Sequence, residues 1–196
     1  MIIGITGGTG SGKTTLLRTI QELGGIILDC DAIYHVLLQT DKKLLSAIED
    51  RFPGTVNENT LDRKKLGAIV FSDEAALQDL NRITHSAVKK KVEDILSKNP
   101  HTLTAIDAIG LFEGGLAQLC HVTVAVTAPE ETRIARLMAR DGISEEYARL
   151  RIRAQKSDAE FSALCDHTLH NDSTLEGFER KCLAFLQDLG IMKAEY

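Results

Sequence analysis

The chain has 196 residues, 43% of them hydrophobic and 5% aromatic, with no tryptophan and a formal net charge of −5. This length and hydrophobic content suit one α/β domain with a sizeable core and a small inserted lobe. The negative charge and the shortage of aromatic side chains exclude a general affinity for nucleic acid or for an anionic membrane surface.

The four cysteines, Cys30, Cys120, Cys165 and Cys182, are far apart and form no C-x-x-C pair. We therefore expect free thiols in a reducing compartment, and neither a zinc site nor a disulfide framework. No basic segment precedes the first apolar residues, and no run approaches the ~20 apolar residues of a membrane span. We expect a cytoplasmic protein with no membrane or nucleic-acid partner, and the oligomeric state stays open.

The first predicted element is a short buried strand over Ile2–Thr6, which is rich in β-branched side chains. A helix is indicated over Lys13–Leu23, and the Gly24-Gly25 pair marks its end. Between them, residues 7–14 read Gly-Gly-Thr-Gly-Ser-Gly-Lys-Thr, which fits the phosphate-loop motif G-x-x-x-x-G-K-[ST]. That motif requires a strand before it and a helix after it, as predicted here.

The residue types of this loop explain how it would bind a nucleoside triphosphate. Glycines let the backbone turn tightly and bring its N–H groups up to phosphate oxygens. Lys13 can reach the β- and γ-phosphates, and the Thr14 hydroxyl can ligate Mg²⁺. The alternative, a glycine-rich turn that binds nothing, is disfavoured by the flanking strand and helix. We predict that ATP and Mg²⁺ bind at Gly7, Gly8, Thr9, Gly10, Ser11, Gly12, Lys13, Thr14 and Thr15.

Such loops occur in motors, GTPases, transport ATPases and small-molecule kinases. The compact length favours a kinase of a small metabolite, and the chain lacks the N-K-x-D motif that reads guanine. Two alternatives stay open beside the acceptor favoured below. One is a kinase of another nucleoside, nucleotide or sugar acid, and the other is a nucleotide-dependent switch or scaffold without transfer to a metabolite.

The second predicted strand, Ile26–Asp29, ends in Asp29-Cys30-Asp31. In an open α/β sheet the carboxyl ends of the strands line the ligand crevice. A carboxylate there could accept a proton from a substrate hydroxyl and hold it in line with the γ-phosphate. An equally weighted alternative is that Asp31 only caps a helix that begins at Ala32.

From about residue 32 to residue 98 the chain is mostly helical, with a break at Pro53-Gly54 and polar residues through Thr60. One crossover needs less helix than this, so we predict a small lobe beside the sheet. The third strand, Thr102–Ile106, is followed by Asp107. That carboxylate could help to organise Mg²⁺ through water, or could be a solvated loop acid.

Val122–Val126 is the fourth predicted strand and Thr168–Leu169 a weak fifth. Continuous apolar runs separated by helical stretches are typical of a parallel sheet covered on both faces. We therefore predict an α/β fold with a five-stranded parallel sheet flanked by helices.

Three later helix starts are indicated by capping residues. Pro129 suits the first helical position, and Ser144 is a plausible N-cap. Ser173 and Glu176 match a capping box for the last helix.

Six arginines lie between residues 133 and 153, a local basic cluster in an acidic chain. The guanidinium fork suits phosphate oxygens on which charge develops during transfer. We expect Arg140 to meet the phosphates first, then Arg136 and Arg153. Arg133 and Arg149 are expected on exposed helix faces, solvated or paired with nearby glutamates.

In order around the phosphate-binding loop, the motifs of the chain resemble those of dephospho-CoA kinase. The loop is similar to T-G-G-x-G-S-G-K-[ST]-T, and D-x-D follows about fifteen residues later. Similar segments cover most of the chain: D-A-D-x-I-x-[HR] at Asp29–His35, L-D-R-x-x-L-x-x-x-V-F at Leu61–Phe71, L-x-x-I-x-H-P from Leu80, P-L-L-F-E at Leu111–Glu113, R-x-G-x-S-x-E-x-A-x-x-R-I-x-x-Q at Arg140–Gln155, and A-D-x-x-I-x-N up to Asn171.

The resemblance implies ATP-dependent phosphorylation of the ribose 3′-hydroxyl of dephospho-CoA, which gives coenzyme A. It implies a single P-loop kinase domain, 1–196, with its core at about 1–31 and 101–196. A helical CoA-binding lobe would span about 32–100, and a lid about 140–160.

By the same resemblance Asp31 is the catalytic base, Lys13 and Arg140 support the transfer, and Glu113 matches a glutamate of the family. The residues that resemble substrate positions of the lobe are Arg63, His85 and His35.

Two positions depart from the family pattern. Ile109-Gly110 replaces the proline before the Leu111–Glu113 segment, and Ser86 replaces the proline after the lobe histidine. These departures concern loop geometry and acceptor docking more than the ATP chemistry.

Overall fold

The computed structural model describes residues 1–191 and divides the chain into two compact units. Of the described residues, the first unit comprises Met1–Ile27, Thr102–Leu111 and 120–191. The second comprises Leu28–His101 and Phe112–Leu119. Each unit has secondary structure of its own, and each is described by itself.

Most of the first unit's strands belong to a five-stranded sheet with the order β2-β5-β1-β6-β7, in which β2 includes the first residues assigned to the second unit. Its central strand β1 pairs in parallel with β5 and β6, and β6 pairs in parallel with β7. The predicted five-stranded parallel sheet is confirmed. The strands are β1 (Ile2–Thr6), β2 (Ile26–Asp29), β5 (Thr104–Asp107), β6 (Val122–Thr127) and β7 (His167–His170).

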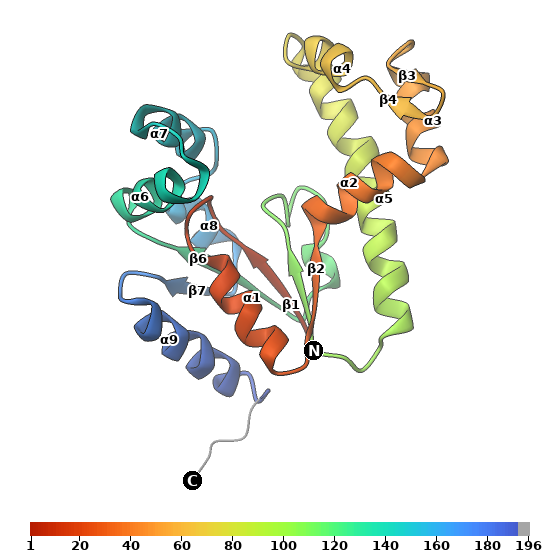
Figure 1. Ribbon diagram of the computed structural model, residues 1–196. Coiled ribbons are helices and arrows are strands. Elements are labelled where there is room, and N and C mark those ends of the chain that lie inside the picture. The colour runs from red at the N-terminus through yellow and green to blue at the C-terminus, as the bar shows by residue number, and fades with distance from the viewer. Residues whose placement is uncertain (192–196) are drawn as a thin grey trace. The chain divides into compact units, whose positions relative to one another are not determined.

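Two helices, α1 (Lys13–Glu22) and α9 (Leu175–Asp188), pack against each other on one side of this sheet (Figure 1). Their buried side chains, among them Leu16, Phe178 and Leu186, form one apolar cluster with residues of β1, β5 and β6. Burying each such side chain contributes about 1.5–3 kcal/mol of transfer free energy. This cluster fixes the start of α1 against the end of β1, where the glycine-rich loop lies.

The remaining helices of the first unit follow β6. Helix α8 (Asp158–Leu164) contacts β6, and α6 (Glu130–Asp141) packs on α7 (Glu145–Arg153). The α6–α7 pair has a small apolar cluster of its own, made by Ile134, Leu137, Ala148 and Ile152.

The second unit consists mainly of helices gathered on the long helix α5 (Glu74–Lys98). Its other helices are α2 (Cys30–Thr40), α3 (Lys42–Arg51), α4 (Arg63–Val70) and the short 3₁₀ helix η1 (Ala117–Leu119). Helices α2, α3 and α4 all contact α5, so the long helix is the central element of this unit (Figure 1).

A two-stranded antiparallel hairpin, β3 (Val56–Asn57) and β4 (Thr60–Leu61), lies between α3 and α4. The sequence analysis predicted only a polar break here. Glu58 and Asn59 form the turn, with φ of 47° and 64°. Two consecutive positive φ angles are typical of a type I′ turn, but this turn lacks the glycine that usually indicates one in a sequence.

Two of the three predicted helix starts were wrong by one position. Thr174 caps α9 by accepting a hydrogen bond from the Gly177 N–H, so the predicted Ser173 capping box is absent. Pro129 is the N-cap of α6 rather than its first helical residue. Ser144 caps α7 as predicted, with its hydroxyl accepting from the Tyr147 N–H.

Candidate active site

The glycine-rich loop turns directly from the end of β1 into α1. Its glycines at 7 and 12 have φ of 137° and 101°, a region that other residues rarely adopt. A Cβ at Gly7 would lie 2.2 Å from the Val126 carbonyl oxygen of the neighbouring strand. The loop therefore depends on glycine for both its backbone angles and its close packing on β6.

The loop forms one wall of a cavity of about 590 Å³ within the first unit. That volume lies within the ~300–1,000 Å³ range of small-molecule sites. The structure brings four residues that the sequence analysis singled out to this cavity: Lys13, Asp107, Arg136 and Arg140. Thr9, Gly10, Ser11, Gly12 and Thr14 of the loop also line it.

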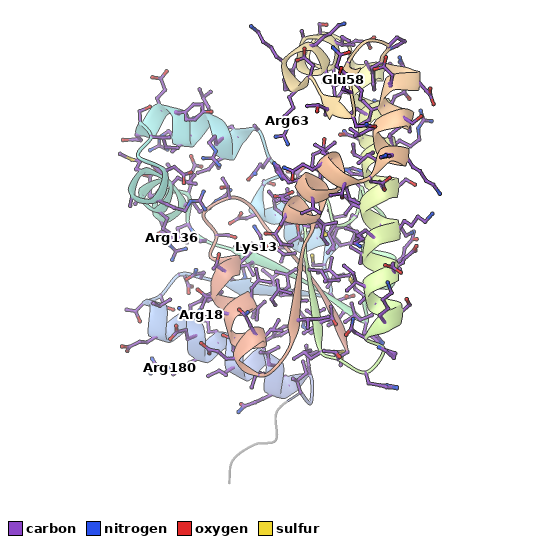
Figure 2. All side chains as sticks on the ribbon, turned by 45° about the vertical axis from the view of Figure 1, so that its right-hand side comes forward. Lys13, Arg18, Glu58, Arg63, Arg136 and Arg180 are labelled. Carbon is purple, nitrogen blue, oxygen red and sulfur yellow. The ribbon has the colours of Figure 1, made fainter. Side chains whose placement is uncertain are left out.

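Lys13 lies at the start of α1, and its Nζ donates to the Gly7 carbonyl oxygen at 2.8 Å. Figure 2 shows Lys13 and Arg136 on the same unit. Arg136 Nη1 donates to the carbonyl oxygens of Gly10 and Ser11 at 3.1 and 3.3 Å. Burial lowers the pKa of Arg136, which stays a cation at any physiological pH.

Two amide side chains that the sequence analysis left without a role also hold the loop. Gln155 Oε1 accepts a hydrogen bond of 2.8 Å from the Thr9 backbone N–H. Asn171 Nδ2 donates to the Ser11 carbonyl oxygen at 2.9 Å, and its Oδ1 accepts from Arg136. Both residues end a motif quoted above, and that position was the available signal.

Arg133 corrects the expectation that it lies on an exposed helix face. Its side chain is 4% exposed, and Nη1 donates to Asp158 at 2.9 Å. Its Nε donates to the Thr9 carbonyl oxygen at 2.9 Å. The inner face of α6 carries Arg133 under the loop, which periodicity alone did not indicate. Arg149 pairs with glutamates as expected, namely Glu130, Glu131 and Glu145.

Arg140 and Arg153 differ in their surroundings. Arg140, in the last turn of α6, is exposed and donates to Asp141, which also pairs with Arg151. The hydrogen bonds from Arg140 and Arg151 hold the pKa of Asp141 well below its usual range. Arg153, at the end of α7, is exposed and does not line the cavity.

Two oxygen-bearing side chains at the cavity wall are of the type that Mg²⁺ takes as ligands. Thr14 offers a hydroxyl and Asp107, at the end of β5, offers a carboxylate. Mg²⁺ in kinases is held by one or two carboxylates together with substrate phosphates and water, so these two suffice. Among the described residues, no three acidic, histidine or cysteine side chains cluster into a metal site.

In the second unit, the structure shows which of Asp29 and Asp31 caps α2. Asp29 is the N-cap of α2, and its Oδ1 accepts from the Ala32 N–H at 2.9 Å. The alternative that Asp31 is the cap is therefore wrong. Asp31 lies in the first turn of α2 and is exposed. Its carbonyl oxygen accepts from His35 Nδ1 at 2.7 Å.

The other predicted substrate residues border two cavities of the second unit. His85 of α5 and Glu113 share a cavity of about 430 Å³ with Arg82 and Ser86. Arg63, the first residue of α4, borders a smaller apolar cavity. His35 lies one turn after Asp31 on α2.

None of the described helices combines the length and the apolar character needed to cross a membrane.

Known proteins resemble this chain over nearly its whole length. The family model described as Dephospho-CoA kinase matches residues 1–177. The dephospho-CoA kinase of Carboxydothermus hydrogenoformans is 36% identical over 192 residues, which cover 95% of this chain and 93% of that protein. The Thermus thermophilus dephospho-CoA kinase is 35% identical over 189 residues, with 96% and 92% covered.

Solved structures agree with the sequence relatives. A crystal structure of a Thermus thermophilus protein, 35% identical, superposes with a TM-score of 0.79 over 96% of this chain and 97% of that one. The Campylobacter jejuni dephospho-CoA kinase, 26% identical, gives 0.67 over 97% and 98%. Shikimate kinase from Bacteroides thetaiotaomicron, at 19% identity, gives 0.55 over 98% and 99%, and shares the fold.

Proposed function

The chain belongs to the dephospho-CoA kinase family, and from that premise we propose how its own residues carry out the transfer. The reaction moves the γ-phosphoryl group of ATP to the ribose 3′-hydroxyl of dephospho-CoA and gives coenzyme A and ADP. The observation that carries the proposal is that Asp29, and not Asp31, caps α2. Asp29 accepts the hydrogen bond from the Ala32 N–H at the start of α2, which leaves the exposed carboxylate of Asp31 available to the acceptor.

The first unit holds ATP through the residues of its large cavity. Backbone N–H groups from Gly7 to Thr15 and the positive end of α1 receive the phosphates. Lys13 exchanges the Gly7 carbonyl oxygen for phosphate oxygens when ATP binds. Arg136 and Arg140 at the cavity wall stabilise the negative charge that moves onto the β–γ bridging oxygen, and Arg153 is the third candidate.

The second unit holds the acceptor. Asp31 accepts the proton of the 3′-hydroxyl as the 3′-oxygen bonds to the γ-phosphorus. The bond from the γ-phosphorus to the bridging oxygen breaks, and ADP leaves with that electron pair. Arg63, His85 and His35 contact the acceptor, and the guanidinium of Arg63 suits its phosphates.

Thr14 and Asp107 would hold Mg²⁺ on the nucleotide, because both offer oxygen at the same cavity wall. The ion, when bound, neutralises charge on the β- and γ-phosphates. We extend the proposal to a cytoplasmic setting without a nucleic-acid or membrane partner. The four free cysteines and the net charge of −5 support that extension.

The test uses two conservative variants that lie two residues apart at the start of α2. Asp31→Asn removes the base but keeps the shape, so turnover of dephospho-CoA should fall at least about a hundredfold while ATP affinity changes little. Asp29→Asn is the matched control, because asparagine caps a helix about as well as aspartate. Coenzyme A is measured by mass after incubation with ATP, Mg²⁺ and dephospho-CoA. Near-normal turnover by Asp31→Asn would remove Asp31 from the mechanism.

A further inference from the structure

A second, apolar cavity of about 200 Å³ lies in the second unit and has no place in the mechanism so far. Helices α2, α4 and α5 and strand β4 all contribute to its wall. Its lining combines two aromatic side chains, Tyr34 and Phe71, with leucines such as Leu38 and Leu66, and with Arg63. Whole ligands usually fill ~300–1,000 Å³, so this cavity suits one moiety of a larger molecule.

Phe71 is the unusual member of this lining. Its side chain is 87% exposed, more than any other large hydrophobic side chain in the part of the chain that the structure describes. The ring lies against α4, where a Cβ on Gly67 would come within 3.3 Å of Phe71 Cε2. The glycine thus leaves room for the ring beside α4, and the ring stays open to solvent.

Helix α2 connects this cavity with Asp31. Asp31, Tyr34 and Leu38 are spaced i, i+3, i+7, so they follow one face of the helix. The axial rise from Asp31 to Tyr34 is only about 4.5 Å at ~1.5 Å per residue. Tyr34 and Arg63 line the same cavity; burial raises the pKa of the Tyr34 phenol, and the charge of Arg63 opposes that rise. Figure 2 shows Arg63 on this unit.

We propose that this cavity seats the adenine base of dephospho-CoA, between the rings of Tyr34 and Phe71. The inference rests on the proposed role of Asp31. The 3′-hydroxyl and the base are substituents of the same ribose, so a hydroxyl at Asp31 brings the base about one helical turn away. Two flanking aromatic rings suit a planar heteroaromatic base, which stacks on them. Arg63 at the edge then meets the 5′-diphosphate.

The flexible pantetheine arm is the competing occupant from the same substrate. The arm is long, whereas the cavity has a volume of only about 200 Å³ and is lined by two aromatic rings. It is also joined to the ribose through the 5′-diphosphate, so it lies more bonds away from the 3′-hydroxyl than the base does. The adenine base fits both the size of the cavity and its distance from Asp31.

A single tryptophan reports on the seat directly. Because the chain has no tryptophan, Phe71→Trp introduces a unique fluorophore at the cavity. Val36→Trp is the matched control, because Val36 is 55% exposed on another face of α2 and does not line the cavity. Each variant is titrated, without ATP, with dephospho-CoA and with 4′-phosphopantetheine, which carries the arm but no base.

Saturable quenching of Phe71→Trp by dephospho-CoA alone, with no change in Val36→Trp, is the expected result. Unchanged Phe71→Trp emission at saturating dephospho-CoA would overturn the seat. Quenching by 4′-phosphopantetheine would also overturn it, because that result would place the arm in the cavity.

Kinetics supply an independent measurement on an exposed residue whose loss leaves the core intact. Phe71→Ala should raise KM for dephospho-CoA about tenfold, since base stacking on one aromatic ring contributes ~1–3 kcal/mol. Its kcat and its KM for ATP should stay within about twofold, and Phe71→Tyr should restore KM. An unchanged KM in Phe71→Ala would overturn the seat.

The two proposals fail separately. Quenching of Phe71→Trp together with an active Asp31→Asn would reject Asp31 as the catalytic base and keep the adenine seat. An inactive Asp31→Asn, with no quenching of Phe71→Trp, would keep Asp31 as the catalytic base and reject the adenine seat.

Discussion

Lys13 makes a hydrogen bond to its own loop that ATP has to replace. Its Nζ donates to the Gly7 carbonyl oxygen, so in this state the ammonium closes the loop on itself. Lys13→Ala should lower turnover at least about a hundredfold, because a preorganised charge at the transferred phosphoryl group is lost. The readout is coenzyme A formation at saturating ATP.

The control for Lys13 lies further along the same helix. Arg18, labelled in Figure 2, is half-exposed and pairs with Glu179 of α9. Arg18→Ala should keep turnover within about twofold, because exposed ion pairs contribute little. Equal losses in the two variants would indicate damage to α1 rather than loss of a phosphate contact.

Arg133 makes a stability prediction, since its charge is buried under the loop. Asp158→Ala removes its carboxylate partner and also the acceptor of the Ala128 N–H. Stranding a buried guanidinium should cost about 3 kcal/mol, which lowers Tm by roughly 6–12 °C in a domain of this size. Thermal unfolding measures the shift. Asp172→Ala, which breaks the exposed pair with Lys181, should barely change Tm, and equal shifts would contradict the assignment.

At the scale of elements, the sequence was informative wherever apolar residues run continuously. The five strands of the sheet and the helix after the loop follow from such runs and from glycine stops. Helix starts were less predictable, because neighbouring Ser and Thr residues compete to cap, as Ser173 and Thr174 do. Residues that hold the loop from a distance, such as Arg133, depend on tertiary packing that no local pattern records.

The β3–β4 hairpin shows why a turn can escape detection. Glu58 takes φ of 47°, where a residue with a Cβ is strained by roughly 1–2 kcal/mol. Glu58→Gly should relieve that strain and, after the extra entropy of the unfolded chain, stabilise the protein by about 0.5–1 kcal/mol. Urea unfolding measures the midpoint.

The control for Glu58→Gly is a glycine introduced into the neighbouring helix α4. Ala68→Gly in the exposed part of α4 should destabilise by about 1 kcal/mol, since φ is negative throughout a helix interior. A loss of stability in both variants would show that Glu58 is not strained in its turn.

At the scale of the whole molecule, the proposed function assigns one substrate to each of the two units. The residues proposed for ATP belong to the first unit, and Asp31, Tyr34 and Phe71 belong to the second. Each substrate should therefore protect its own unit from hydrogen exchange when added alone, because binding suppresses local opening. ATP should slow exchange at residues 7–15, and dephospho-CoA should slow it at residues 30–40 and 61–71.

Mass-resolved peptides from the two units can be compared in one experiment, with Lys13→Ala and Phe71→Ala as variants. Lys13→Ala should weaken the protection by ATP and leave that by dephospho-CoA. Phe71→Ala should do the opposite, because the base would lose one of its two rings. Dephospho-CoA that protected only the first unit would contradict the assignment of the acceptor to the helical unit. The exchange pattern thus identifies the residues that hold each substrate when it is bound alone.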